Sequence, residues 1–392
     1  MYYYGVSVYP DLRPITEIEE YLKTASSYGC RRVFSSMFSV EGSNEQIIDY
    51  FREFIKIAHD NKIEVVLDVN TEFLKQLAVE PTDLKLFSDI GVDMLRMDGN
   101  YNDERDIKLI TNKYGIKIEF NASAVDESFV KFIADNKVDP ELVYFGHNFY
   151  PQRYTALSWD TFIKANQVIK KYGFYHLSAF VSSNAPDTHG VWDAIVGLPT
   201  VEKLRDLPID LQARVLLATN DIDMILIGNA YANQQELKVL GELDIKVNLP
   251  DQVLKSPLIN YFKELSDNKK TPIVIKVQTV SDISKIEEEI LFDFAPHADM
   301  GDSSEWIWRT RIPRFFYNDK KIKYRKYDLE NFEVGDIVVV NENYQHYGGE
   351  IQIVLEPIIN DGTRNLVAKI SKEELILLDL IKAKDIVIFK RK

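Results

Sequence analysis

Short apolar segments alternate with amphipathic segments over the first 230 residues of this 392-residue chain. The apolar segments have the length of buried strands and are bounded by polar or turn-forming residues. They predict eight strands, at residues 4–9, 31–38, 64–70, 94–98, 117–121, 142–149, 176–183 and 224–230.

The segments between most of these predicted strands have the period of helices. Residues 15–29 and 44–62 are clear examples, and several such segments end in Gly or Asn-Lys, as helix C-termini often do. Eight strand–helix repeats of roughly 25–35 residues match a (β/α)8 barrel, whose usual size is about 250 residues. A doubly wound open sheet is the alternative, but the count of eight favours the barrel.

The pattern changes after about residue 240, where β-type segments separated by turn residues replace the helical period. These segments are residues 245–249, 271–277, 335–341, 349–356, 365–371 and 385–392. We therefore expect two domains: a (β/α)8 barrel at residues 1–240, and a small all-β domain at residues 245–392 that forms a closed or partly closed barrel.

Composition and charge restrict the partners of the chain. Hydrophobic residues make up 45% and charged residues 28%, as in ordinary globular proteins. The net charge of −14 argues against binding to nucleic acid or an anionic membrane. The N-terminal segment MYYYGVSVYP does not resemble a signal peptide, and no apolar stretch reaches eighteen residues. We expect a cytoplasmic protein, with a homo-oligomer left open.

The sequence gives little sign of a metal or cofactor. Cys30 is the one cysteine, which excludes an internal disulfide and a thiolate zinc site, and we expect it to be buried. No H-x-H or H-E-x-x-H motif occurs. We therefore predict no cofactor, although a Mg²⁺ site built from Asp68, Asp98 and Glu119 stays open.

Polar side chains end three neighbouring predicted strands in pairs separated by one residue. The pairs are Asp68 and Asn70, Arg96 and Asp98, and Glu119 and Asn121. Residues two apart on a strand share a face, and barrel enzymes place their active site at the C-terminal ends of the strands. These pairs therefore predict a cluster of carboxylates in the barrel mouth, with a layer of structural salt bridges as the alternative.

The next strand is followed by the segment GHNFYPQRYT, at residues 146–155, which is rich in hydrogen-bonding side chains. We predict that residues of this segment and of the last two strand ends bind the substrate. The candidates are His147, Asn148, Tyr150, Gln152, Arg153, Ser182 and Asn229, together with Arg96 and Asn121 from the polar pairs.

Several reaction classes lack their sequence signals. No G-x-S-x-G nucleophile motif occurs, and no predicted barrel strand ends in a lysine for Schiff-base chemistry. Paired carboxylates are the catalytic groups of glycosidases, so we predict Asp98 and Glu119 as the catalytic pair, with Asp68 orienting a hydroxyl group or tuning their pKa values. A phosphosugar sensor without activity and a sugar-phosphate isomerase or epimerase are the alternatives.

Several motifs resemble the signature segments of a known enzyme family. The segments are MLRMDGN (94–100), IEFNAS (118–123), GHNFYPQRYTAL (146–157), GLPTVEKLRDLPIDLQA (197–213), ILIGNAYAN (225–233) and HADMGDSSEWIWR (297–309). They are similar to segments of the bacterial 6-phospho-N-acetylmuramidases, the MupG-type glycoside hydrolases. The similarity is loose after Arg309.

This resemblance implies a (β/α)8 barrel followed by a cyclophilin-like β-domain, and a role in peptidoglycan recycling in the cytoplasm. The implied substrate is N-acetylmuramic acid 6-phosphate joined by a β-1,4 bond to N-acetylglucosamine. Its phosphate and lactyl carboxylate require cationic partners, since the protein itself is acidic. The candidates are Arg96, Arg153 and His147 in the barrel, with Arg309 and His297 in the second domain. The anomeric outcome and the identity of the acid stay open.

Overall fold

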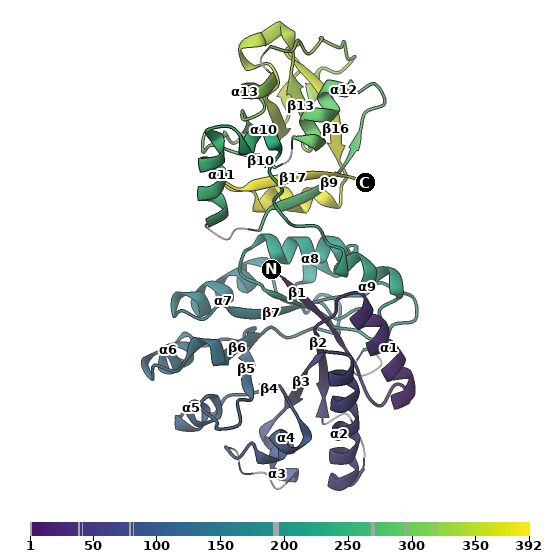
Figure 1. Ribbon diagram of the computed structural model, residues 1–392, viewed down its shortest axis with the longest axis vertical. Coiled ribbons are helices and arrows are strands. Elements are labelled where there is room, and N and C mark those ends of the chain that lie inside the picture. The colour runs from purple at the N-terminus through teal and green to yellow at the C-terminus, as the bar shows by residue number, and fades with distance from the viewer. Residues whose placement is uncertain are drawn as a thin grey trace. The chain divides into compact units, whose positions relative to one another are not determined.

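The first structural unit is a closed barrel of eight parallel strands (Figure 1). The strands are β1 (Tyr3–Ser7), β2 (Arg32–Ser36), β3 (Glu64–Val69), β4 (Met94–Met97), β5 (Lys117–Asn121), β6 (Val143–Gly146), β7 (His176–Val181) and β8 (Met224–Ile227). Strand β8 pairs with β1 and closes the ring. The predicted barrel is therefore confirmed over an open sheet.

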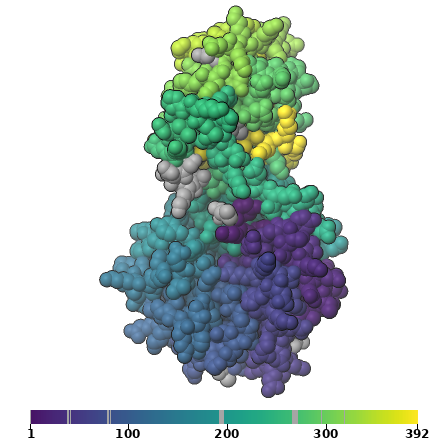
Figure 2. Space-filling view, in the orientation of Figure 1, coloured from purple at the N-terminus to yellow at the C-terminus, as the bar shows by residue number. Residues whose placement is uncertain are grey.

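The computed structural model describes residues 2–37, 40, 42–77, 80, 82–190, 196–267, 271–294, 296–317 and 319–392. The chain divides into two units, residues 1–217 with 221–243, and residues 218–220 with 244–392. In the space-filling view, residues coloured purple to teal form the first unit, and residues coloured green to yellow form the second (Figure 2).

The helices of the first unit lie outside the strands (Figure 1). They are α1 (Ile15–Ser27), α2 (Asn44–Asp60), α3 (Thr71–Gln76), α4 (Lys85–Ile90), α5 (Glu104–Ile110), α6 (Glu127–Asp135), α7 (Trp159–Lys171), α8 (Ile209–Ala218) and α9 (Gln234–Gly241). The helices predicted at residues 15–29 and 44–62 are thus confirmed. Reciprocal side-chain caps fix the start of α2, through Ser43 and Gln46, and the start of α9.

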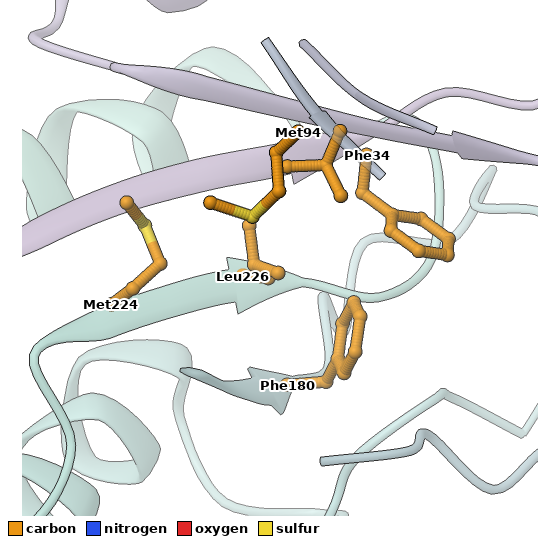
Figure 3. Packing of buried hydrophobic residues seen from close by; sticks show 6 residues of the cluster. Phe34, Met94, Phe180, Met224 and Leu226 are labelled. Atoms are coloured by element: carbon orange, nitrogen blue, oxygen red, sulfur yellow. The ribbon is translucent and has the colours of Figure 1, made fainter. Parts of the chain in front are cut away.

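The middle of the barrel interior is apolar. Figure 3 shows side chains from opposite sides of the barrel packed together, and such contacts are formed only inside the ring. The cluster consists of Phe34, Val66, Met94, Phe180, Met224 and Leu226. Since alternate residues of a strand share a face, residues two positions before and after these also point inward. On β2, β3 and β4, charged side chains occupy some of these inward positions on both sides of the layer, with Arg32 and Glu64 on one side and Asp68 and Arg96 on the other.

An ionic group occupies the N-terminal end of the barrel interior. Glu64 accepts a hydrogen bond of 2.6 Å from Nη2 of Arg32 and another from Lys117. Burial alone would raise the pKa of Glu64, but the charge of Arg32 and the hydrogen bond from Lys117 lower it. Glu64 on β3 therefore links its neighbour β2 with β5, which lies beyond β4 in the barrel.

The second unit is built on a mixed sheet of seven strands in the order β10-β17-β9-β16-β13-β14-β11. Their bounds are β9 (Ile273–Thr279), β10 (His297–Ala298), β11 (Ile307–Thr310), β13 (Asp336–Val340), β14 (Ile351–Val354), β16 (Arg364–Ile370) and β17 (Ile386–Arg391), with β12 (Asn331–Phe332) and β15 (Ile358–Ile359) forming a separate pair. The β-rich second domain is thus confirmed, but the strand predicted at residues 245–249 does not form.

Helices also occur in the second unit, although the sequence showed little helical period there. They are α10 (Asp251–Leu254), α11 (Leu258–Asp267), α12 (Lys285–Glu288) and α13 (Arg314–Tyr317). Among them, α10 and α13 are single turns, too short to give a periodic pattern, and α12 continues directly into a π-helical segment, Glu289–Asp293. Among the helices of the described residues, none has both the length and the apolar character needed to cross a membrane. Cys30, in the first unit, is buried as predicted.

We predict that Glu64→Gln destabilises the barrel by about 2 kcal/mol at pH 7, because it leaves Arg32 and Lys117 without their carboxylate. The lowered pKa of Glu64 means that its contribution is present above about pH 4.5 and is lost as the pH falls further. Calorimetric unfolding at pH 7 and pH 3.5 measures both effects.

Asp89→Asn is the matched control for this change. Asp89 forms an exposed ion pair with Lys85, one turn away on α4, and such pairs contribute about 0.5 kcal/mol or less. A loss for Glu64→Gln no larger than that of the control would contradict a stabilising role for the buried ionic group.

Candidate active site

The polar residues predicted at three strand ends lie in one row inside the barrel. Asp68 on β3 is in register with Arg96 on β4, and Arg96 is in register with Glu119 on β5. Asp68 and Arg96 follow the interior residues Val66 and Met94 by two positions, so they also point inward. The row therefore lies on the C-terminal side of the apolar layer, where barrel enzymes have their active sites.

Arg96 is the centre of this row. Its Nη1 donates a hydrogen bond of 2.8 Å to Asp68 and lies 3.8 Å from Oδ1 of Asp98. Its Nε lies 3.6 Å from Oε1 of Glu119, and its Nη2 donates to the side chain of Asn148. One guanidinium group thus holds three carboxyl groups and one amide from three strand ends and the β6 loop. We call Asp68, Arg96, Asp98 and Glu119 the carboxylate cluster.

Burial determines the electrostatics of the cluster. It raises the pKa of Asp68 from 3.8 to about 6, although Arg96 acts in the opposite direction. Burial also raises the pKa of Glu119, again against the effect of Arg96. Burial alone would lower the pKa of Arg96, but Asp68 and Glu119 raise it. The cluster therefore retains a cation at its centre and favours a proton on a neighbouring carboxyl group.

The three carboxyl groups differ in their access to solvent. The side chain of Asp98 is 45% exposed, whereas those of Asp68 and Glu119 are 10% and 2% exposed. Asp98 follows the last residue of β4 and so leaves the barrel interior. A ligand in the barrel mouth would therefore meet Asp98 first, and the other two carboxyl groups lie deeper.

Glu119 fits its position because the neighbouring strand carries a glycine. A Cβ atom at Gly146 would lie 2.3 Å from Oε1 of Glu119, which is closer than any normal contact. Ser178 on β7 donates a hydrogen bond of 3.2 Å to the other carboxylate oxygen. The glycine that opens the segment GHNFYPQRYT thus provides space for the buried carboxyl group.

His147 lies behind the cluster in a chain of hydrogen bonds. Its Nε2 is 2.8 Å from Oδ1 of Asn166, and its Nδ1 is 3.2 Å from Oγ of Ser123. That hydroxyl oxygen accepts a hydrogen bond from the backbone N–H of Asn148, whose side chain binds Arg96. Burial lowers the pKa of His147 to about 4. His147 is therefore placed to fix the loop that orients Arg96, and it is fully buried from any ligand.

The sequence did not indicate Ser123 or Asn166 as residues of the site, although the position of Asn166 on its helix is a recognisable signal. It lies with Phe162, Ala165 and Ile169 on the buried face of α7. An amide on an apolar helix face requires a buried partner, and His147 is that partner. Asn121, which was predicted to bind substrate, accepts a hydrogen bond of 2.8 Å from the backbone N–H of Ser123.

The rest of the segment after β6 is held by a buried arginine that the sequence did not indicate. Arg205 donates hydrogen bonds to the backbone carbonyl oxygens of Tyr150 and Gln152, at 3.0 and 3.2 Å. It also donates to the carbonyl oxygens of Val196 and Gly197. The predicted ligand Arg153 instead forms a two-pronged ion pair with Asp206 and remains partly exposed.

Asn229 is bound to the protein backbone and Ser182 is buried, so neither presents a free face in the mouth. The side-chain amide of Asn229 makes hydrogen bonds to both the N–H and the carbonyl of Ser183. Ser182 is fully buried, and its Oγ lies 2.6 Å from where a Cβ atom at Gly197 would be. Glu236 accepts a hydrogen bond of 2.6 Å from Ser183, so the start of α9 also supports this loop.

Arg309 and His297 belong to the second unit. Nε of Arg309 lies 3.2 Å from Oε1 of the buried Glu350, and its guanidinium lies over the ring of Tyr347. His297 is fully buried, its ring contacts Phe389, and burial lowers its pKa to about 4. His297 is therefore a core residue of this unit and does not reach a ligand.

No group of three His, Cys, Asp or Glu side chains in the described ranges is arranged to hold a metal ion. In the carboxylate cluster, the position that a cation would occupy between the carboxyl groups is taken by the guanidinium of Arg96.

A (β/α)8 barrel with carboxyl groups at its strand ends, two of them with raised pKa values, is an arrangement typical of glycosidases. The comparison with known families agrees. Residues 4–242 match the family model described as 6-phospho-N-acetylmuramidase, N-terminal, and residues 273–390 match the corresponding C-terminal model. The chain therefore belongs to the 6-phospho-N-acetylmuramidase family, whose members are glycosidases.

Two solved structures resemble the whole chain. An uncharacterized protein from B. cereus is 31% identical, with a TM-score of 0.83 over 100% of this chain and 99% of that chain. A conserved protein of unknown function from Enterococcus faecalis is 22% identical, with a TM-score of 0.64 over 100% and 96%, and supports the fold alone. No match was found among curated proteins.

We predict that His147 stays neutral from pH 5 to pH 8, with its proton on Nε2. Its pKa of about 4 lies below this range, and the oxygen of Asn166 accepts the proton of Nε2. Long-range ¹H–¹⁵N NMR of the imidazole nitrogens measures both properties, with His147→Gln used for assignment. A titration midpoint above pH 6 would contradict the buried, neutral state.

Proposed function

We propose that this protein hydrolyses the β-1,4 bond between N-acetylmuramic acid 6-phosphate and N-acetylglucosamine, as a cytoplasmic step of peptidoglycan recycling. Family membership supports the substrate class. The observation that carries the catalytic part is the carboxylate cluster, in which Arg96 holds Asp68, Asp98 and Glu119 at the C-terminal ends of adjacent strands.

Asp98 is the carboxylate that contacts the sugar. It is the most exposed of the three, and it lies at the strand end rather than inside the barrel. A carboxylate beside the anomeric carbon stabilises the positive charge of the oxocarbenium-like transition state, as a nucleophile or as a base for water. Its neighbour on β4, Arg96, limits its orientation.

The proton for the leaving oxygen comes from the buried carboxyl groups. Glycosidases need one carboxyl group with a raised pKa as general acid. Burial raises the pKa of Glu119 and brings that of Asp68 to about 6, so each holds a proton at a higher pH than an exposed carboxyl group. Of the predicted pair Asp98 and Glu119, we assign the role of acid to Glu119, and Asp68 shares Arg96 with it.

Two routes remain for the nucleophile. Carboxyl groups on adjacent strands start from a backbone spacing of about 4.8 Å, which is nearer to the separation in retaining enzymes than to that in inverting ones. The 2-acetamido group of the substrate provides the other route, in which the substrate itself attacks and the carboxyl groups assist.

Recognition of the phosphate requires a cation beyond the cluster. Arg96 is already surrounded by carboxylates, and His147 is buried and neutral at physiological pH. Arg153 is the candidate in the barrel unit that keeps a partly exposed guanidinium, since Asp206 is its partner on one edge only. A phosphate would compete with Asp206 for the N–H groups of the Arg153 guanidinium.

We predict cleavage of the 6-phosphorylated muramyl disaccharide, and little or no cleavage of its unphosphorylated form. Mass spectrometry of both incubations detects the two monosaccharides directly. Binding of the phosphorylated form without any cleavage would favour the sensor alternative, and the absence of both would reject the proposed substrate.

We also predict that Glu119→Gln and Asp98→Asn each lower kcat by about 10³-fold or more while KM changes little, because binding does not depend on the transferred proton or on the stabilised cation. Initial rates with the phosphorylated disaccharide measure this. Asp98 is exposed, so its variant tests catalysis without disturbing the core.

The matched control is Glu141→Gln. Glu141 is an exposed carboxylate before β6, where it pairs with His176 at the opposite end of the barrel. This variant is expected to keep the wild-type rate. Retention of most activity in Glu119→Gln and in Asp98→Asn would reject the carboxylate mechanism.

A further inference from the structure

The second unit contains a cavity of about 430 Å³ that the proposed reaction does not use. Its wall includes Met300, Arg311, Arg314, Phe315, Gln345 and His346. Small-molecule sites have volumes of about 300–1,000 Å³, so a cavity at the low end suits a monosaccharide better than a disaccharide. Two guanidinium groups in a cavity of this size indicate an anionic ligand.

A buried carboxylate fixes the arginines around this cavity. Glu350 is fully buried, and its two oxygens lie 3.2 Å from Nε of Arg309 and 3.3 Å from Nη1 of Arg314. Both guanidinium groups also lie over the ring of Tyr347, at 5.5 and 4.5 Å from its centroid. Because these contacts orient the guanidinium groups in advance, a ligand does not have to order them.

In the ion-pair group at the cavity, cations outnumber carboxylates, although the chain as a whole carries −14. Ion pairs join Arg309, Arg311 and Arg314 to two carboxylates, Asp302 and Glu350. Three cations against two anions leave one positive charge unbalanced in this group. Arg311 pairs with Asp302 at 3.2 Å, and 38% of its side chain remains exposed, so it can still donate to an anion.

The cavity also has features suited to a sugar ring. The side chain of Phe315 is 60% exposed, which is unusual for so large an apolar group. Its ring provides an apolar surface for the C–H face of a sugar. Gln345 also lines the cavity and adds a polar side chain to its wall.

We propose that this cavity is a second ligand site, which binds a hexosamine monosaccharide that carries a phosphomonoester. The phosphate binds Arg311 and Arg314, and the sugar ring lies against Phe315. The sugar part rests on the proposed function, because hydrolysis of a phosphorylated disaccharide releases such a monosaccharide. The anion part rests on the cavity alone.

The test uses the full-length protein and histidine ring signals in NMR. His346 lines the cavity and reports on it, whereas His147 reports on the barrel. N-acetylglucosamine 6-phosphate is the probe, with N-acetylglucosamine and inorganic phosphate as controls. We expect the sugar phosphate to shift the His346 signal in a saturable way, and N-acetylglucosamine to leave it unchanged.

Variants separate the two parts of the proposal. Arg311→Gln is expected to weaken binding of the sugar phosphate about tenfold, because it removes a charged hydrogen bond to the phosphate. Phe315→Ala is expected to weaken the sugar phosphate about fivefold, with no effect on inorganic phosphate. The control is Arg391→Gln, since Arg391 also lies over an aromatic ring, that of Phe292, and pairs with Glu288.

Wild-type affinity in Arg311→Gln, or a His346 signal that does not respond, would overturn the proposal. Equal affinity for inorganic phosphate and the sugar phosphate, unaffected by Phe315→Ala, would overturn its sugar part. The titration involves no turnover. Failure of the proposed function would instead appear as an uncleaved disaccharide, so the two failures are distinguishable.

Discussion

Burial of the Arg96 guanidinium is the constraint on which the barrel mouth depends. A buried cation requires carboxylate or amide partners, and here they come from β3, β4, β5 and the loop after β6. Each partner in turn needs its own support, such as the space at Gly146 for Glu119. The requirements of one side chain therefore fix the relative positions of four successive strand ends.

The apolar layer separates this cluster from a second ionic group at the other end of the barrel. Phe34, Met94 and their neighbours lie between Glu64, toward the N-terminal ends of the strands, and Asp68, toward their C-terminal ends. Charges on either side interact through a medium of low polarity. Burial has the largest effect on the pKa of Glu119, and across the layer Arg32 lowers this pKa while Glu64 raises it. The two ionic groups are thus electrostatically coupled, so the distant one contributes to the properties of the carboxylate cluster.

The sequence was sufficient to predict the barrel, because each strand and helix repeats a local pattern. It was also sufficient to place Asp68, Arg96 and Glu119 together, since strand ends of a barrel converge. It was not sufficient for Arg205 or Ser123, whose roles arise from backbone groups brought near by the fold. For the same reason the sequence predicted Asn229 and Ser182 as substrate-binding residues, although in the fold Asn229 is bonded to the backbone of Ser183 and Ser182 is fully buried.

Arg205 also joins two segments at the mouth of the barrel. One guanidinium group makes hydrogen bonds to carbonyl oxygens of the loop after β6 and of the loop after β7. If either loop moved alone, buried N–H groups would lose their acceptors, at a cost of about 1–3 kcal/mol for each. Low-energy motions on this side of the barrel mouth therefore carry the segments at residues 150–152 and 196–197 together.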